Sequence, residues 1–261
     1  MKKEKKSIII FLIATFILSS VCYYIAITGG EKASGITALL MWCPGAVAII
    51  ISNVFYKKEK VLGFSKCRIK YIFFGIFIPI VYLVGSYGIY WILNPEAFTG
   101  NIYSDSIPFM IGAIFSSVLT ATGEEIGWRG FLLPKMDMFM SRKYAIILSG
   151  LIWAVWHYPL MICGLYQSGT PVWYQLPMFT IEVILITSVM AYLRFRSDSV
   201  WPAIVIHASH NYVDQLFCAP LTNSKNSVYF AGETGFVTVI FVIVIIIVIY
   251  NKKFKRSGKV N

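Results

Sequence analysis

The chain has 261 residues, of which 57% are hydrophobic and 13% are charged, and its formal net charge at pH 7 is +11. A soluble domain averages about 25% charged residues, so the composition excludes an ordinary soluble domain and indicates an integral membrane protein. The net positive charge does not indicate nucleic-acid binding, because the Lys and Arg residues gather at the termini and in a few loops between apolar runs. That placement is typical of cytoplasmic loops, which also favour anionic lipid headgroups.

The chain opens with four lysines in its first six residues, followed by an apolar run over residues 7–28. A run of this length can cross a hydrocarbon core of ~30 Å. The alternative is a cleaved signal peptide, whose apolar region would be only ~7–15 residues long and would end at a small-residue cleavage site. This run is longer and has no A-x-A sequence, so we predict an uncleaved membrane span.

Seven more apolar runs are predicted to be helices, over residues 35–56, 71–93, 107–130, 144–162, 176–195, 200–217 and 235–250. Basic segments lie at the N-terminus, at every second connection and at the C-terminus, which is typical of an even number of spans with both ends in the cytoplasm. The sequence therefore predicts an all-α fold, a polytopic transmembrane helical bundle of about eight spans with both termini cytoplasmic. We expect residues 1–261 to form a single membrane domain, since no repeat or linker interrupts them.

The five cysteines give no sign of a disulfide framework or a metal site. Their number is odd, their spacing is irregular, and no two form a C-x-x-C pair. We expect them to pack as small hydrophobic side chains. They are Cys22, Cys43, Cys67, Cys163 and Cys218.

The fourth apolar run ends in two adjacent glutamates, Glu124 and Glu125, with Arg129 four residues after the second. Carboxylates at the end of an apolar helix are costly, so in a membrane protein they indicate a functional site. Glu125 and Arg129 share a helix face, where the arginine would hold the carboxylate ionised. Glu124 points ~100° away and is free to face a cavity as a general base for water. The alternative is a solvated helix end with an ordinary salt bridge.

Two later apolar runs each carry histidine. His157 lies near the middle of its run, with Trp153 four residues earlier on the same face. Its imidazole can accept or donate a proton near neutral pH, or bind a metal; the alternative is a histidine satisfied by a neighbouring helix. His207 has Asn211 four residues later and His210 three residues later. An Asn or His donor can stabilise an oxyanion, although Asn211 alone would more often join two helices.

Two further acids, Glu182 and Asp214, lie in the sixth and seventh runs. We expect them to make interhelical polar contacts or to face a pore; the alternative for Asp214 is to support His207, seven residues earlier. The sequence has no nucleophile elbow and no H-E-x-x-H motif. Glutamate and histidine without a nucleophilic side chain favour hydrolysis by activated water.

At these residues the chain resembles the CPBP family, which includes the CAAX prenyl proteases of the Rce1 type and the bacteriocin-processing, or Abi, enzymes. The family's E-E-x-x-x-R motif matches Glu124, Glu125 and Arg129. Its F-x-x-x-H motif matches Trp153 to His157, with Trp in place of Phe, and its H-x-x-x-N motif matches His207 and Asn211. The resemblance covers a catalytic core over residues 107–217, and the other spans are only generically similar.

The resemblance implies an intramembrane glutamic endopeptidase that uses no cofactor. Glu124 and His157 would activate the attacking water, and His207 and Asn211 would form the oxyanion site. Glu125 and Arg129 would support them. Family members have also been described as metalloproteases, so an alternative zinc set is Glu124, His157 and His207.

The resemblance also implies a partner, a membrane-associated peptide or protein tail in the lipid bilayer. Short loops, lysine-rich ends and no organellar targeting segment favour a multi-pass protein of a bacterial plasma membrane, where prenylated CAAX substrates are not expected. The main alternative is a bacteriocin self-immunity or scaffold membrane protein that does not need proteolysis. A transporter is disfavoured, because transporters usually contain repeated halves and this sequence has no internal repeat.

Overall fold

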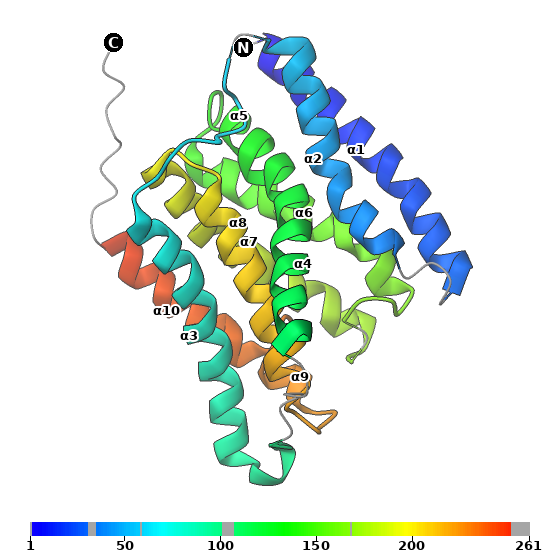
Figure 1. The fold of residues 1–261 in the computed structure, drawn as a ribbon, viewed down its shortest axis with the longest axis vertical. Helices are drawn as coiled ribbons and strands as arrows, with labels where there is room; N and C mark the ends of the chain where they lie inside the picture. The colour runs from blue at the N-terminus through cyan, green and yellow to red at the C-terminus, as the bar shows by residue number, and fades with distance from the viewer. Residues whose placement is uncertain (1, 31–34, 58, 101–106, 168, 252–261) are drawn as a thin grey trace.

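The computed structural model of the chain describes residues 2–30, 35–57, 59–100, 107–167 and 169–251. Over these residues the fold is helical, and the only β pairing is an isolated bridge between Phe98 and Thr222. The predicted all-α class is therefore confirmed (Figure 1).

Among the described residues, six helical stretches are long and apolar enough to cross a membrane, judged by length and composition. They are α1 (Lys2–Gly29), α2 (Ile36–Phe55), α3 (Ile69–Leu93), the continuous stretch Pro108–Met136, α6 (Arg142–Ile162) and α7 (Val172–Ser197). The last predicted run is the shorter apolar helix α10 (Phe236–Asn251). All eight predicted runs are helical, while the number that cross the membrane and the side of each terminus stay predictions. The basic C-terminal segment lies outside the described residues.

The two helices that carry the E-E-x-x-x-R and H-x-x-x-N motifs both change from α to π geometry. Helix α4 (Ile107–Glu125) passes into η3 (Ile126–Leu132) and then α5 (Leu133–Met136), so this helix is longer than the sequence predicted. Helix α8 (Trp201–Asn211) passes into η4 (Tyr212–Cys218). Each π segment begins at the residue after a candidate functional side chain, which fits the tendency of π turns to occur at functional sites.

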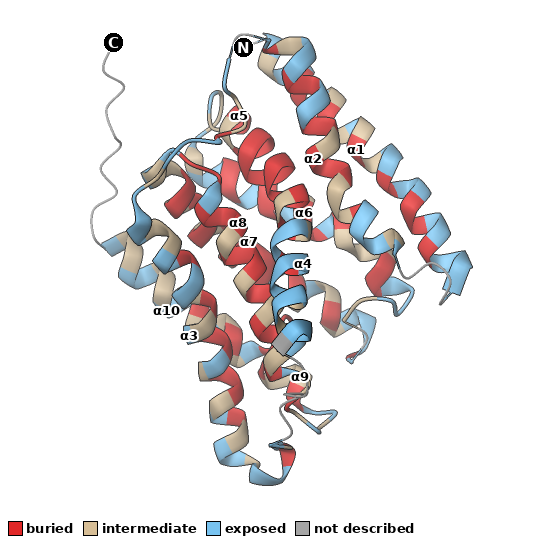
Figure 2. Ribbon diagram, viewed as in Figure 1, coloured by how far each residue is buried: buried red, intermediate tan, exposed pale blue. Residues whose placement is uncertain are grey.

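Helices α4 and α8 lie in the middle of the bundle (Figure 1). Helix α2 packs between α1 and α4, and α8 packs against α3, α4 and α7, while α6 packs along α7. Figure 2 shows that α8 and the end of α4 are largely buried, whereas the beginning of α4 is exposed. The exposed side chains there are large and apolar, as at Phe109, Ile111 and Phe115. A membrane protein presents such a surface to lipid.

The crossing of α2 and α4 depends on glycine. A Cβ atom on Gly123 would lie 2.8 Å from the carbonyl oxygen of Met41, and one on Gly45 would lie 2.3 Å from the carbonyl oxygen of Gly123. Small residues allow the backbones of membrane helices to approach closely. This contact holds the residue directly before Glu124 against α2.

We expect the substitution Gly123→Ala to destabilise the protein by about 1–3 kcal/mol, because the methyl group must push two backbones apart. Gly112→Ala on the same helix is the matched control, since its methyl group would meet nothing within 4 Å. That control should be neutral or slightly stabilising, given the higher helix propensity of alanine. Thermal unfolding in detergent measures both effects, and equal melting temperatures for the two variants would contradict the close contact.

Candidate active site

One cavity brings the four predicted catalytic residues together. Glu124 reaches it from α4, His157 from α6, and His207 and Asn211 from α8. The rest of the wall is mostly apolar, as is usual for binding pockets with a few placed polar groups. The apolar residues include Trp156, Leu160, Phe179, Val183, Ile186 and Met190.

Glu124 is fully buried, and its two carboxylate oxygens have different surroundings. Oε2 accepts hydrogen bonds from the indole nitrogens of Trp153, at 2.6 Å, and Trp128, at 3.3 Å. Oε1 has no hydrogen-bond partner within the described part of the chain. The indoles therefore fix the carboxylate by one oxygen and leave the other free to accept a hydrogen bond from water.

Glu125 does not share the surroundings of Glu124. Its Oε1 accepts a hydrogen bond from Arg129 Nη1 at 2.9 Å and lies 2.9 Å from His207 Nδ1. Arg129 also donates from Nη2 to Thr187 Oγ1 at 2.8 Å, and its guanidinium lies 3.9 Å from the ring centre of Trp153. The expected i,i+4 ion pair is present and buried, and it is tied to both α7 and α8.

These contacts set the direction of the His207 ring. A carboxylate only accepts hydrogen bonds when ionised, so Nδ1 carries a hydrogen toward Glu125. The other nitrogen, Nε2, is left for the cavity, and in the imidazolium form it carries the proton that an oxyanion would accept. Asn211 follows on the same face of α8 and is 8% exposed at the same cavity.

His157 is held in a similar way from its own helix. Its Nδ1 lies 2.9 Å from the carbonyl oxygen of Trp153, and because a carbonyl only accepts, Nδ1 carries the hydrogen. Nε2 of the neutral ring is then the proton acceptor. The rings of Trp156, Tyr166 and Phe179 lie 4.9, 5.5 and 5.2 Å from the imidazole, centre to centre, so aromatic packing fixes its plane.

Several contacts at the cavity were not predicted. Trp153 was expected only to share a helix face with His157, yet its indole donates a hydrogen bond to Glu124 and its carbonyl accepts one from His157. Trp128 was missed, although its i,i+4 spacing from Glu124 was a usable signal.

Glu182 lines the cavity with both carboxylate oxygens buried and without a partner within the described residues. Asp214 accepts a hydrogen bond from Tyr87 at 2.9 Å. No hydrogen bond joins Asp214 to His207 among the described residues.

The four cavity residues do not form a close metal-binding group. Among the described residues, the one group of three whose ligand atoms all lie within 4.8 Å of one another is His210, Asp214 and Glu233. The alternative zinc set predicted from the sequence is not such a group. Glu233 had no signal in the sequence, because it lies in the connection after α9 (Ser227–Phe230), far along the chain from α8.

The fold and the cavity define a helical, multi-pass membrane protein with a buried glutamate–histidine–asparagine site, and comparison with known proteins gives its class. Residues 106–213 match the family of type II CAAX prenyl endopeptidases described as Rce1-like. The chain is also 27% identical over 272 residues to CAAX prenyl protease 2 of Methanococcus maripaludis, an alignment that covers 95% of this chain and 96% of the relative. These matches confirm the resemblance predicted from the three motifs, and they support a membrane protease similar to the Rce1-like CAAX prenyl endopeptidases.

Proposed function

We propose that the protein is an intramembrane endopeptidase that hydrolyses a peptide bond in a membrane-associated peptide or protein tail, using water activated by Glu124 and His157. The observation that carries this proposal is the way hydrogen bonds hold the side chains of Glu124 and His157 at the cavity. Each is held by one atom, Glu124 through Oε2 and His157 through Nδ1, and both side chains line the same cavity. Glu124 Oε1 has no hydrogen-bond partner among the described residues.

In the proposed reaction, Glu124 Oε1 takes a proton from water while His157 Nε2 accepts a hydrogen bond from the same water and orients it. The water oxygen bonds to the carbonyl carbon of the scissile peptide, and the carbonyl oxygen becomes an oxyanion. His207 Nε2–H and the Asn211 amide donate hydrogen bonds to that oxyanion. A donor of this kind, when removed, typically lowers kcat by ~10²–10³-fold.

The intermediate then collapses. The carbon–nitrogen bond breaks, the carbonyl re-forms, and the leaving nitrogen takes the proton held by Glu124, which returns the carboxylate to its starting state. Glu125 and Arg129 do not touch the substrate in this proposal; they hold His207 in place. We favour a reaction without a metal, and in support Glu124, His157 and His207 are not among the groups of described residues whose ligand atoms all lie within 4.8 Å of one another.

The apolar wall of the cavity suits an apolar or lipid-modified substrate segment. The relative from Methanococcus maripaludis is named CAAX prenyl protease 2, whereas the short loops and lysine-rich ends of this chain favour a bacterial peptide without a prenyl group. Both substrates are membrane-anchored tails, and the chemistry at the peptide bond is the same.

The protein reconstituted in lipid vesicles tests the proposal. Matched peptides carrying a C-terminal C-a-a-X sequence, either prenylated or anchored by an acyl chain, are added and the products analysed by mass spectrometry. We expect an internal cut in at least one anchored peptide and none in the same peptide without an anchor. If no anchored peptide is cut, and cells that express a Glu124→Ala variant accumulate no uncut peptide, the protein acts as a scaffold or immunity protein instead.

A further inference from the structure

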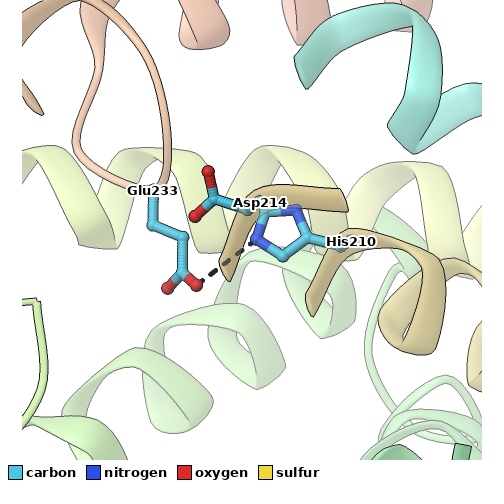
Figure 3. Close-up of side chains that lie close together, drawn as sticks. All are labelled: His210, Asp214 and Glu233. Atoms are coloured by element: carbon cyan, nitrogen blue, oxygen red, sulfur yellow. Dashed lines mark ion pairs between the residues drawn. The ribbon is translucent and has the colours of Figure 1, made fainter. Parts of the chain in front are cut away.

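A second polar cluster lies beside the proposed catalytic residues. His210 comes from α8, Asp214 from η4, and Glu233 from the connection between α9 and α10. Figure 3 shows the three side chains pointing toward one another, with His210 Nε2 3.6 Å from Glu233 Oε1. They are 6%, 3% and 5% exposed, so they are removed from bulk water. The mechanism proposed above uses none of them.

Each side chain of the cluster is held from its outer side by another residue. The Tyr82 hydroxyl lies 2.6 Å from His210 Nδ1, and the Tyr87 hydroxyl donates to Asp214 at 2.9 Å. Glu233 accepts hydrogen bonds from Gln215, at 2.8 Å, and from Tyr166. Histidine and carboxylate ligands of metals are usually held by such outer partners, which fix the ring and direct the ligand atoms inward.

The cluster contains two buried carboxylates, Glu233 and Asp214. In the part of the chain that the structure describes, no salt bridge from Lys or Arg reaches either of them, and His210 is the one basic partner.

Glu182 is a further buried acid at this cavity. Its side chain lines the same cavity as His210 and Glu233, it is 1% exposed, and both its carboxylate oxygens are buried without a partner among the described residues. Buried carboxylates are normally paired or bind a metal ion. A divalent cation held by Asp214 and Glu233 would give two of these buried acids such a partner.

We propose that His210, Asp214 and Glu233 form a binding site for a first-row divalent metal ion such as Zn²⁺, separate from the proposed catalytic residues. One imidazole and two carboxylates are a ligand set that Zn²⁺ accepts, and the nitrogen ligand disfavours Mg²⁺ and Ca²⁺. The ion would tie the connection before α10 to the junction of α8 and η4. Because Asn211 follows His210 directly, the bound ion would also fix one wall of the catalytic cavity.

Zn²⁺ titration of the purified full-length protein tests the site. The tag is removed, the protein is stripped with a chelator in detergent, and binding is followed by calorimetry and elemental analysis. We expect one Zn²⁺ per chain, a higher melting temperature with Zn²⁺, and much weaker binding of Mg²⁺ and Ca²⁺. Glu124→Gln should bind Zn²⁺ as the wild type does, because this carboxylate is not part of the cluster.

Glu233→Gln and Asp214→Asn keep the size of the side chain and should remove stoichiometric binding. Tyr82→Phe removes only the outer hydrogen bond to His210, so its Zn²⁺ affinity should fall ~10–100-fold. Three results would overturn the site: no stoichiometric Zn²⁺ in the wild type, an unchanged affinity in Tyr82→Phe, or loss of Zn²⁺ in Glu124→Gln with retention in Glu233→Gln. The last result would place the ion in the catalytic set. Tyr82→Phe decides the question if the ligand variants do not fold.

Discussion

The substitution Glu124→Gln is expected to abolish peptide cleavage, with a fall in kcat of ~10²–10⁴-fold, the usual contribution of a general base. Glutamine has the shape of glutamate, and its amide oxygen can still accept the hydrogen bond from Trp153. It cannot take a proton from water. Single-turnover cleavage of an anchored peptide in vesicles measures the loss, and the melting temperature should not fall, because the variant removes a buried charge.

Two further variants serve as comparisons for Glu124→Gln. Glu59→Gln is the control, since Glu59 is exposed and pairs with Lys3 on the surface, and it should leave cleavage unchanged. Trp153→Phe restores the aromatic residue of the family's F-x-x-x-H motif but removes the indole donor to Glu124, so we expect a smaller loss than in Glu124→Gln. A folded Glu124→Gln protein that still cleaves at more than about a tenth of the wild-type rate would contradict the role of Glu124 as the base.

The substitution Arg129→Met should be the most destabilising change at the site. It leaves the buried carboxylate of Glu125 without its guanidinium, and breaking a buried ion pair by removing one partner costs about 3–5 kcal/mol. Cleavage should fall as well, because Glu125 orients His207. Unfolding by heat or denaturant in detergent, together with the cleavage assay, gives both effects.

The double variant Arg129→Met with Glu125→Gln separates the ion pair from simple packing. If the pair is what matters, the double variant is less destabilised than the sum of the two single variants, since neither charge is left alone. Glu59→Gln again serves as the exposed comparison, and the loss of a surface pair should change stability by no more than about 1 kcal/mol. Additive effects in the double variant would show that Arg129 acts through its contacts with Trp153 and Thr187 instead.

Much of the site could be predicted from spacing within single helices. The i,i+4 interval of Glu125 and Arg129 predicted their ion pair, and the different direction of Glu124 predicted that it would reach a cavity. The apolar runs predicted the helices because a membrane span needs a long apolar segment. The charge pattern of the connections predicts an even number of spans, and that number stays a prediction.

Contacts between helices could not be predicted in this way. The hydrogen bond from Trp153 to Glu124 joins residues 29 positions apart, and it depends on how α4 and α6 pack. Thr187 on α7 had no signal, because a threonine in an apolar helix usually bonds to its own backbone. Glu233 reaches His210 only because the connection before α10 folds back over α8 and η4. The π segments could not be predicted either, because the change from α to π hydrogen bonding does not require particular residue types.

The π segments have a consequence for how this protein can change in length. A π turn holds one more residue than the α turn it replaces, so η3 resembles an α-helix with an insertion that the bundle has absorbed. Deleting one residue between Ile126 and Arg129 would restore the α spacing, so the residues after η3 could keep their places while Arg129 would stand three residues after Glu125 in place of four. The residues of η3, which are all buried, would lose the contacts that the wider turn gives them. Natural variants of this segment should therefore differ by substitution and keep its length.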